Sequence, residues 1–482
     1  MQDIYLENDA TGLAALVASG EVSPDALLDC ALERVAAINP ALNAVVMLRE
    51  GVAREAIRAG LPGGPFTGVP FLLKDLGAEA IAFPTNNGSA LMRDSVHRYD
   101  SELYLRLRAA GLVSFGRTTS PELGIGPVTE AQVYGGPTRN PWNTDYTSGG
   151  SSGGAGAAVA AGIVPAAHGS DGGGSVRIPA SSCGLVGFKP TRARLPEGPG
   201  AGEGWGGMAI DGFLTRSLRD TAALLDAVNG PDLGAPYFPP PMRGTFVQAL
   251  ATPPRKLRVA LCPMTLSGTP VHADCAEAVE KTGLLLESLG HAVEPVKLPA
   301  DLGVEEMMVA WTRIVACGTA LSVRSVLGGT PLDRDLLDGV TRGALACAEQ
   351  VSGADYLQAI GEIHAFGRRM AHLLTQCDVL VTPTLAAPPA RVGQHKPENE
   401  DFMDYRTGPG GVFEYSPFTA VFNASGQPAV SLPLHWNAAE LPVGVHLAMP
   451  FGEDEALMSL AAQIEAAAPW WDTQQQLVAR LG

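Results

Sequence analysis

Two short segments rich in glycine and serine contain the strongest candidates for nucleophilic chemistry. The segment GGSSGG covers residues 149–154, and the segment DGGGS covers residues 171–175. In the second segment Ser175 follows three consecutive glycines, Gly172, Gly173 and Gly174. Backbone N–H groups of successive glycines can converge on one point and stabilise the oxyanion that forms when an acyl carbonyl is attacked. We therefore predict that Ser175 is a nucleophile beside an oxyanion hole.

A serine needs a base to act as a nucleophile, and two side chains are candidates. Lys74 ends the apolar segment PFLLK, and burial there would lower its pKa. To be mostly neutral at pH 7, this lysine must lose more than three pKa units, at a cost of about 4–5 kcal/mol. The second candidate is His168, seven residues before Ser175. Spacing alone favours a surface Lys74 paired with an acidic side chain, and a structural His168.

Phosphate binding is the main competing chemistry, because glycine-rich loops also hold phosphate at the start of helices. A P-loop has the pattern GxxxxGK[ST], and no lysine follows either loop of this chain. The pattern GxGxxG carries little weight in a chain with 57 glycines. We therefore favour a nucleophile over a phosphate site.

The segment between the two loops must bring them together. Residues 153–161 are small and are typical of a tightly packed helix, and residues 163–168 are typical of a strand. A helix of nine residues spans about 14 Å, and a strand of five or six residues spans about 17–20 Å. If the helix packs antiparallel on the strand, the chain returns close to its starting point. This fold-back would place the two serine-bearing loops side by side.

Helices and strands alternate along the rest of the chain, which predicts an α/β fold with a largely parallel or mixed sheet. Ser23 and Pro24 form a typical helix start. We expect helices at residues 13–18, 26–37, 101–110, 274–289 and 455–468, the last of them being the final helix. We expect strands at residues 68–74, 112–115, 256–263, 377–384 and 427–435. Long loops rich in glycine and proline are predicted at about residues 196–216 and 394–417, as pocket walls or lids, or as disordered surface insertions.

Composition excludes several classes of protein. Hydrophobic residues make up 46% of the chain and charged residues 17%, so a sizeable apolar core is expected. The net charge of −17 disfavours nucleic acid or an anionic membrane as the main partner. The first residues lack a basic segment followed by an apolar one, and the seven cysteines are scattered without a CxxC pair. We therefore expect a cytoplasmic protein with reduced thiols.

These motifs resemble the amidase signature family. Its core pattern is matched by GGSSGG, by GSDGGGSVRIPAS at residues 169–181 and by GVPFLLKDL at residues 68–76. The similarity covers nearly the whole chain and is weak at residues 230–255 and 386–413. It implies a single domain over residues 1–482, with the catalytic core at about residues 65–220. The family fold is a central twisted mixed β-sheet covered by helices on both faces.

The resemblance further implies a Ser–Ser–Lys triad that needs no metal or organic cofactor. Ser175 would be the nucleophile, Ser151 the bridging serine at a cis peptide bond, and Lys74 the base. Protons would pass from Ser175 through Ser151 to Lys74, and an acyl-enzyme would form on Ser175. The oxyanion would be held by the N–H groups of Gly172, Gly173 and Gly174.

Five further residues are expected around this triad. Asp171 and Arg177 flank the glycine loop with opposite charges that could fix its shape, and Ser152 would cap the following helix or hydrogen-bond within the triad. By resemblance, Cys317 would line the substrate pocket. Ile125 stands where a family member that cleaves a cyclic amide has an amide side chain, and this implies a more apolar pocket.

We therefore predict a serine amidohydrolase that cleaves C–N bonds of small amides, anilides or carbamates, similar to the urethanases and aryl acylamidases of the family. The alternative within the family is a glutamine-dependent amidotransferase subunit that acts on charged transfer RNA with partner subunits. A non-catalytic binding protein is disfavoured because all three triad residues are present. We expect a small-molecule substrate, no nucleic acid or membrane partner, and a monomer or homodimer.

Overall fold

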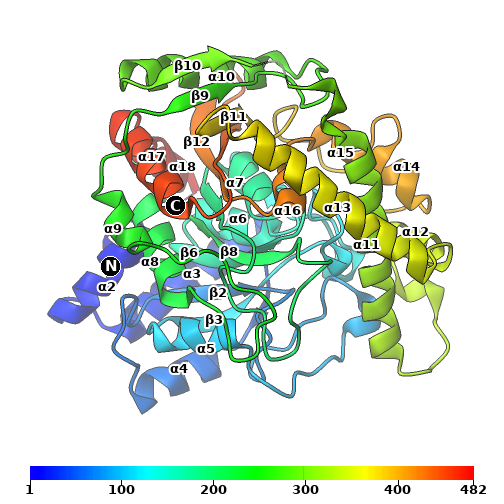
Figure 1. Ribbon diagram of the computed structural model, residues 1–482. Coiled ribbons are helices and arrows are strands. Elements are labelled where there is room, and N and C mark those ends of the chain that lie inside the picture. Colours follow the sequence, from blue (N-terminus) through cyan, green and yellow to red (C-terminus); the bar gives the residue numbers. More distant parts are fainter. Residues whose placement is uncertain (297, 482) are drawn as a thin grey trace.

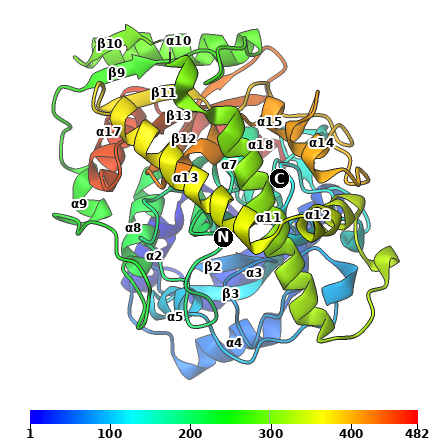
Figure 2. The same ribbon diagram turned by 45° about the vertical axis from the view of Figure 1, so that its right-hand side comes forward.

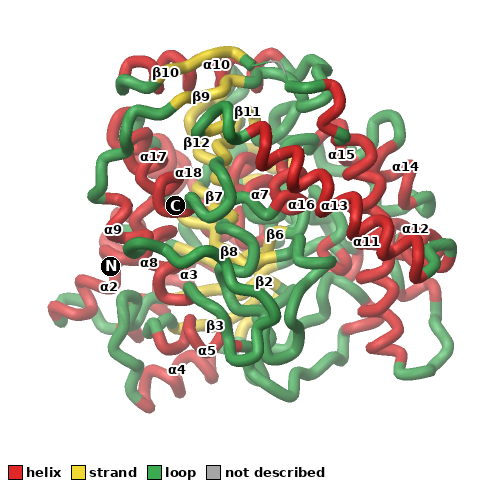
Figure 3. Tube along the Cα trace, viewed as in Figure 1, coloured by secondary structure: helices red, strands yellow, loops and turns green. Residues whose placement is uncertain are grey.

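The computed structural model describes residues 1–296 and 298–481 of the chain. Eleven strands form one mixed sheet in the order β1-β3-β2-β6-β8-β7-β12-β13-β11-β9-β10. Figure 3 shows these strands running through the middle of the molecule with helices around them. A separate pair is formed by β4 and β5. The strands are β1 Val45–Leu48, β2 Pro70–Lys74, β3 Val113–Thr118, β4 Arg139–Asn140, β5 Asn143–Thr147, β6 Ala166–Asp171, β7 Val186–Lys189, β8 Ile210–Thr215, β9 Arg258–Leu261, β10 Ala292–Pro295, β11 Val379–Pro383, β12 Ala429–Trp436 and β13 Pro442–Ala448.

Helices surround the sheet on both faces, as predicted. They are α1 Gln2–Glu7, α2 Ala10–Ser19, α3 Pro24–Leu42, α4 Glu50–Ala59, α5 Glu102–Ala109, α6 Gly153–Ala160, α7 Arg177–Cys183, α8 Leu218–Val228, α9 Phe246–Leu250, α10 Ala273–Ser288, α11 Val304–Leu327, α12 Gly339–Glu349, α13 Gly353–Leu373, α14 Phe402–Thr407, α15 Val412–Tyr415, α16 Thr419–Ser425, α17 Asp454–Ala467 and α18 Trp471–Leu481. Among the described residues, no helix is both long enough and apolar enough to cross a membrane.

The direction of the strands changes along the sheet. Strand β2 is parallel to both β3 and β6, whereas β6 is antiparallel to β8. The strands from β8 to β11 pair antiparallel, and β11, β9 and β10 are parallel again. In Figure 1 the β2 and β3 end lies at the bottom and the β9 and β10 end at the top. The C-terminal ends of the parallel strands β2 and β6 therefore lie side by side.

Strand β7 illustrates how the two faces are covered. Phe188 packs edge to face on Phe246 of α9, and α9 packs with α8 and α17. The neighbouring Gly187 lies so close to Ala180 of α7 that an added Cβ would be 2.6 Å away. Successive residues of a strand point to opposite faces, so α7 covers one face and α9 the other.

A group of long helices lies beside this sheet and carries a second apolar core. Helix α11 packs on α12 and α13, and α13 packs on α16 (Figure 2). Their buried side chains include Trp311, Phe366 and Phe422. This group supplies residues that reach the loop at the end of β6.

The predicted fold-back between the two serine-bearing loops is confirmed. Helix α6 packs on β6, and the N–H of Ser152 donates to the carbonyl oxygen of Ser175 at 3.2 Å. The strand begins at Ala166, later than predicted, because it follows Pro165, which has no N–H to donate. Ser23 caps α3 as predicted. The expected last helix is followed by another, α18, which starts at Trp471.

Candidate functional site

Lys74 is the last residue of β2 and is fully buried, with 0% of its side chain surface exposed. Its Nζ lies 2.7 Å from Oγ of Ser151 and 2.9 Å from Oγ of Ser170. Burial lowers the pKa of Lys74 to about 7, although the negative charges of Asp211 and Asp171 act in the opposite direction. A neutral amine at this position can accept a proton from a hydroxyl.

The backbone of Lys74 is fixed from two sides. The N–H of Lys74 donates to Nδ1 of His168 at 3.2 Å, and the guanidinium of Arg117 donates to the carbonyl oxygen of Lys74 at 2.5 Å. Nε2 of His168 lies 2.9 Å from a carboxylate oxygen of Asp211. Because both ring nitrogens have partners, His168 holds Lys74 in place and is not available as the base.

Ser151, the predicted bridging serine, is buried and follows a cis peptide bond from Gly150. Ser152 does not cap helix α6 with its side chain. Instead, its hydroxyl accepts from the N–H of Ser170 at 3.2 Å and lies 3.3 Å from the carbonyl oxygen of Ser170. Ser152 therefore joins the two serine loops through the backbone of the residue that contacts Lys74.

Ser175 lies between β6 and α7 and is 8% exposed. It lines a cavity of about 350 Å³ together with Ser151 and Ser170. Among the contacts of the described residues, no hydrogen bond joins the hydroxyls of Ser151 and Ser175. Catalytic hydrogen bonds are often long without substrate and tighten when substrate binds.

The segment of residues 171–175, called here the oxyanion loop, is held by side chains from two distant helices. Three successive carbonyl oxygens each accept one hydrogen bond. Asn423 donates to Asp171 at 2.8 Å, the indole of Trp311 donates to Gly172 at 3.1 Å, and Thr419 donates to Gly173 at 2.6 Å. In a trans peptide the N–H points opposite to the C=O, so these contacts also orient the N–H groups of the three glycines.

The N–H groups of the oxyanion loop differ in their availability. The N–H of Gly174 donates to the carboxylate of Asp171 at 2.8 Å, although the sequence predicts it as an oxyanion donor. The N–H groups of Gly172, Gly173 and Ser175 have no hydrogen-bond acceptor in the part of the chain that the structure describes. The free donors are therefore those of Gly172, Gly173 and Ser175.

Gly174 cannot be replaced without distortion of the loop. Its φ of +126° favours glycine, and an added Cβ would lie 2.3 Å from Oγ1 of Thr419. An added Cβ at Gly172 would lie 2.5 Å from the ring of Trp205. Glycine at these positions lets the loop pack closely against its neighbours.

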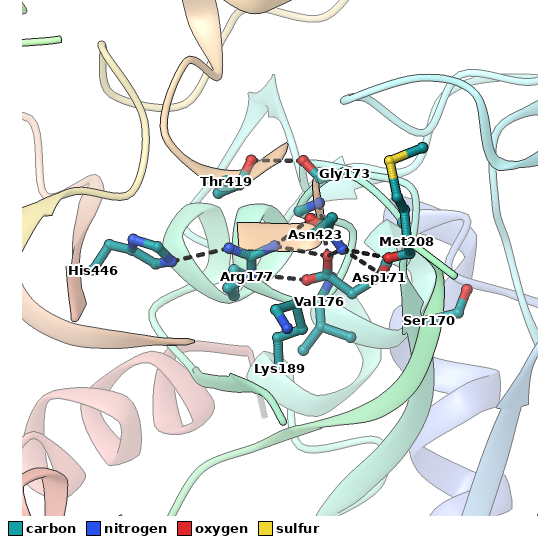
Figure 4. A network of polar contacts seen from close by, with 12 residues as sticks. Ser170, Asp171, Gly173, Val176, Arg177, Lys189, Met208, Thr419, Asn423 and His446 are labelled. Carbon is teal, nitrogen blue, oxygen red and sulfur yellow. Dashed lines mark hydrogen bonds and ion pairs between the residues drawn. The ribbon is translucent and has the colours of Figure 1, made fainter. Parts of the chain in front are cut away.

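A buried ion pair fixes the base of the oxyanion loop (Figure 4). Arg177 donates to both carboxylate oxygens of Asp171, at 2.8 and 3.0 Å. The amide of Asn423 donates to Asp171 at 2.9 Å and accepts from Arg177 at 2.7 Å, and His446 lies 3.0 Å from Arg177. The Arg177 charge and these hydrogen bonds hold the pKa of Asp171 below its usual range despite burial. Asp171 and Arg177 thus pin the loop, as expected from their opposite charges.

The predicted long loop at residues 196–216 forms one wall of the cavity, in part as strand β8. The wall includes Glu197, Trp205 and Asp211, and α11 contributes Thr319 and Ser322 from the other side. In the loop predicted at residues 394–417, the structure has helices α14 and α15.

Neither of the two residues predicted to line the substrate pocket, Cys317 and Ile125, is among the residues that line the cavity of about 350 Å³. Thr319 and Ser322 share one face of α11, and Cys317 is rotated away from that face by the helical geometry. Ile125 lines a separate small cavity with Val128 and Tyr405. The two residues before Ile125, Leu123 and Gly124, adopt positive φ.

A second, narrow pocket of about 20 Å³ reaches Ser175 from another side. Its wall contains Trp205, Trp311 and Phe413, together with the buried guanidinium of Arg406. Arg406 donates to the carbonyl of Ile125, and its guanidinium lies 4.9 Å from the centre of a Trp311 ring. Ser175 therefore lies between a larger polar cavity and a smaller aromatic pocket.

Sequence reasoning missed Ser170, Trp311, Thr419 and Asn423. Ser170 stands within the motif GSDGGGS, and Asn423 within FNASGQP, but neither motif indicates which side chains reach the loop. Trp311 and Thr419 lie more than a hundred residues from their partners, and no local pattern identifies them. Within the described residues, no group of three or more His, Cys, Asp or Glu side chains is arranged to hold a metal ion.

Comparisons with known proteins agree with this architecture. The family model described as amidase matches residues 26–458. The 6-aminohexanoate-cyclic-dimer hydrolase of Paenarthrobacter ureafaciens is 36% identical over 99% of this chain and 98% of its own length. A structure of 6-aminohexanoate cyclic dimer hydrolase with substrate has a TM-score of 0.91 at 34% identity, covering 98% of this chain and 99% of that one. A bacterial aryl acylamidase of the amidase signature family has a TM-score of 0.85 at 28% identity, covering 98% of both chains.

Proposed function

Because the chain belongs to the amidase family, we propose that it is a serine amidohydrolase that cleaves small amides, anilides or carbamates with a Ser175–Ser151–Lys74 triad. One observation carries this proposal. The amine of Lys74 is fully buried and lies 2.7 Å from Oγ of Ser151, and Ser151 lines the cavity that is also lined by Ser175. A buried amine whose pKa is strongly lowered and which contacts a serine beside a cavity is a candidate for a functional base.

In the proposed reaction, neutral Lys74 accepts a proton from Ser151, and Ser151 accepts one from Ser175. Oγ of Ser175 then attacks the carbonyl carbon of the substrate. The proton returns through Ser151 to the leaving nitrogen, the C–N bond breaks, and an acyl group remains on Ser175. Water repeats the same proton transfers and releases the acid. Substrate binding brings the two serine hydroxyls into hydrogen-bond contact.

The oxyanion of the tetrahedral intermediate is stabilised by the N–H groups of Gly172, Gly173 and Ser175. The anchored carbonyls of Asp171 and Gly172 support the orientation of the first two N–H groups. The N–H of Ser175 belongs to the same peptide as the carbonyl of Gly174, which accepts from the N–H of Ile178 at 2.7 Å. Such fixed donors need no reorganisation as negative charge develops, and removing one typically lowers the rate about 10²–10³-fold.

The alternative of a glutamine-dependent amidotransferase subunit is not favoured. The two relatives described above are named as a cyclic-dimer hydrolase and an aryl acylamidase, and neither name refers to transfer RNA. The aromatic rings of Trp205, Trp311 and Phe413 give the pocket beside Ser175 an apolar wall. Whether the protein is a monomer or a homodimer stays a prediction.

The test is hydrolysis of a panel of anilides, aliphatic amides, carbamates and glutamine by the wild type and by S175A. We expect anilide or amide hydrolysis that falls at least about a thousandfold in S175A. A matched control is S322A, which removes another serine hydroxyl from the wall of the same cavity. Equal rates for wild type and S175A would show that Ser175 takes no part in the reaction. Hydrolysis of glutamine, with none of the other substrates, would favour the amidotransferase.

A further inference from the structure

The cavity beside Ser151 and Ser175 has an acidic wall. Three carboxylic acids line it, from the loop after β2, the loop before β8 and strand β8 itself: Glu79, Glu197 and Asp211. No lysine, arginine or histidine is among its lining residues in the described chain. The cavity is therefore unlike the apolar pocket that the sequence predicts.

Only one of these three carboxylates has a lysine, arginine or histidine side chain as a partner. Asp211 lies 2.9 Å from Nε2 of His168. Within the described residues, no basic side chain lies within 4 Å of Glu79 or Glu197. Asp232 adds further negative charge behind the wall, where it accepts from the N–H of Glu197 at 3.1 Å. Burial together with the neighbouring carboxylates raises the pKa of Glu197 well above its usual range. A cation in the cavity would relieve this repulsion.

Two further features of the same cavity suit a cation. Thr319 is 2% exposed, and its hydroxyl has no hydrogen-bond partner in the described chain. It lines the cavity from α11 and can accept a hydrogen bond from a ligand. Trp205 also lines the cavity, and aromatic rings attract cations.

We propose that the acidic wall binds a protonated amine of the substrate, so that the preferred substrates are amides or carbamates that carry an ammonium group away from the scissile bond. An ammonium group has three donors, which match the carboxylates of Glu79 and Glu197 and the hydroxyl of Thr319. The inference rests on the proposed function, because the cavity is taken as the place where the substrate meets Ser175. The cavity volume of about 350 Å³ suits a short aliphatic chain between the two groups.

The proposal is tested with matched pairs of substrates at pH 7.5. One series consists of ω-aminoacyl 4-nitroanilides of four to eight carbons, each paired with the analogue in which methyl replaces the ammonium group. A second series consists of mono-N-acetyl diamines, each paired with the N-acetyl alkylamine of the same length. We expect kcat/KM to favour the cationic member at least tenfold in one of the two series. Equal values throughout both series would overturn the proposal.

Variants connect this preference to the wall. In E197Q and E79Q the preference should fall to less than threefold, because glutamine keeps the shape and removes the charge. The control is E287Q, which removes an exposed carboxylate of α10 that does not line the cavity, and its preference should stay at the wild-type level. An unchanged preference in both E197Q and E79Q would contradict the assignment.

The two proposals fail in distinguishable ways. If neutral substrates are hydrolysed by the wild type and not by S175A, but cationic members gain nothing, only the acidic subsite is wrong. If no substrate is hydrolysed in a manner that depends on Ser175, the proposed function is wrong. In that case binding of hexylammonium, compared with hexanol, to wild type and E197Q by calorimetry still tests the cation site. Equal weak binding of both ligands would exclude it.

Discussion

The pKa of Lys74 makes a quantitative prediction about the pH dependence of the reaction. Burial lowers this pKa from 10.5 to about 7. At pH 7 about half of the Lys74 amines are then neutral, whereas an ordinary lysine would be neutral in only about 0.03% of molecules. The burial of this one side chain therefore raises the population of active base roughly a thousandfold or more.

The direction of the pH dependence follows from the requirement that Lys74 be neutral. Activity should rise with pH, because protonated Lys74 cannot accept the proton of Ser151. We expect kcat/KM for an uncharged anilide to rise about tenfold per pH unit below the midpoint and to level off about one unit above it. The uncharged substrate is chosen so that titration of Glu79 and Glu197 has little effect on binding. A profile without an acidic limb, or with a midpoint above pH 9, would refute the assignment of Lys74 as a neutral base.

Lys189 provides a matched control for this experiment. It is also buried, and burial lowers its pKa to about 7. Its amine donates to the carbonyl of Pro190 at 2.8 Å, and it does not line the cavity. K189M should keep the midpoint of the pH profile even if its rate is lower, whereas K74M should lose activity at every pH. A shift of the midpoint in K189M would show that the observed titration belongs to Lys189 and not to Lys74.

Three substitutions test the bridging serine, the oxyanion loop and the hydrogen bonds around Asp171. S151A should lower kcat on the order of a thousandfold with KM within a fewfold, measured by steady-state anilide hydrolysis, and a kcat near that of the wild type would exclude a bridging role. W311F keeps an aromatic ring but removes the indole N–H that donates to the carbonyl of Gly172, so kcat should fall about tenfold at similar KM. A change confined to KM would indicate that Trp311 acts through packing and not through this hydrogen bond. N423A leaves the buried carboxylate of Asp171 with fewer hydrogen-bond partners and should lower the free energy of unfolding by about 2–4 kcal/mol. Urea titrations measure this change, and a loss below about 0.5 kcal/mol would show that the contacts of Asn423 with Asp171 and Arg177 contribute little to stability.

The local parts of the site could be predicted from the sequence. The run of apolar residues before Lys74 indicates a buried strand end, and the small residues after Ser152 indicate a helix that folds back on β6. Both predictions depend on short-range periodicity, and the structure confirms the strand β2 and the helix α6. The order of the strands and the group formed by α11, α12 and α13 depend on pairings between distant segments. Local pattern carries no information about such pairings.

The residues that line the cavity could not be predicted from local sequence pattern either. Glu79, Glu197 and Thr319 come from three segments far apart in the sequence, and only the fold reveals that they share one cavity. The predicted apolar pocket followed from Ile125, but in the fold Ile125 lines another cavity, together with Val128 and Tyr405. The expectation for Gly174 failed for a similar reason. Its N–H is taken by Asp171, whose carboxylate is oriented by Arg177 and by Asn423 of α16.

The central claim is that an acyl group forms on Ser175. The most direct measurement is mass spectrometry of the protein quenched milliseconds to seconds after mixing with 4-nitrophenyl butyrate, with peptide mapping of the adduct. The account predicts one butyryl group per chain, located on Ser175, with a matching burst of nitrophenol and no adduct in S175A. An adduct on another residue, or turnover by S175A at the wild-type rate, would contradict it.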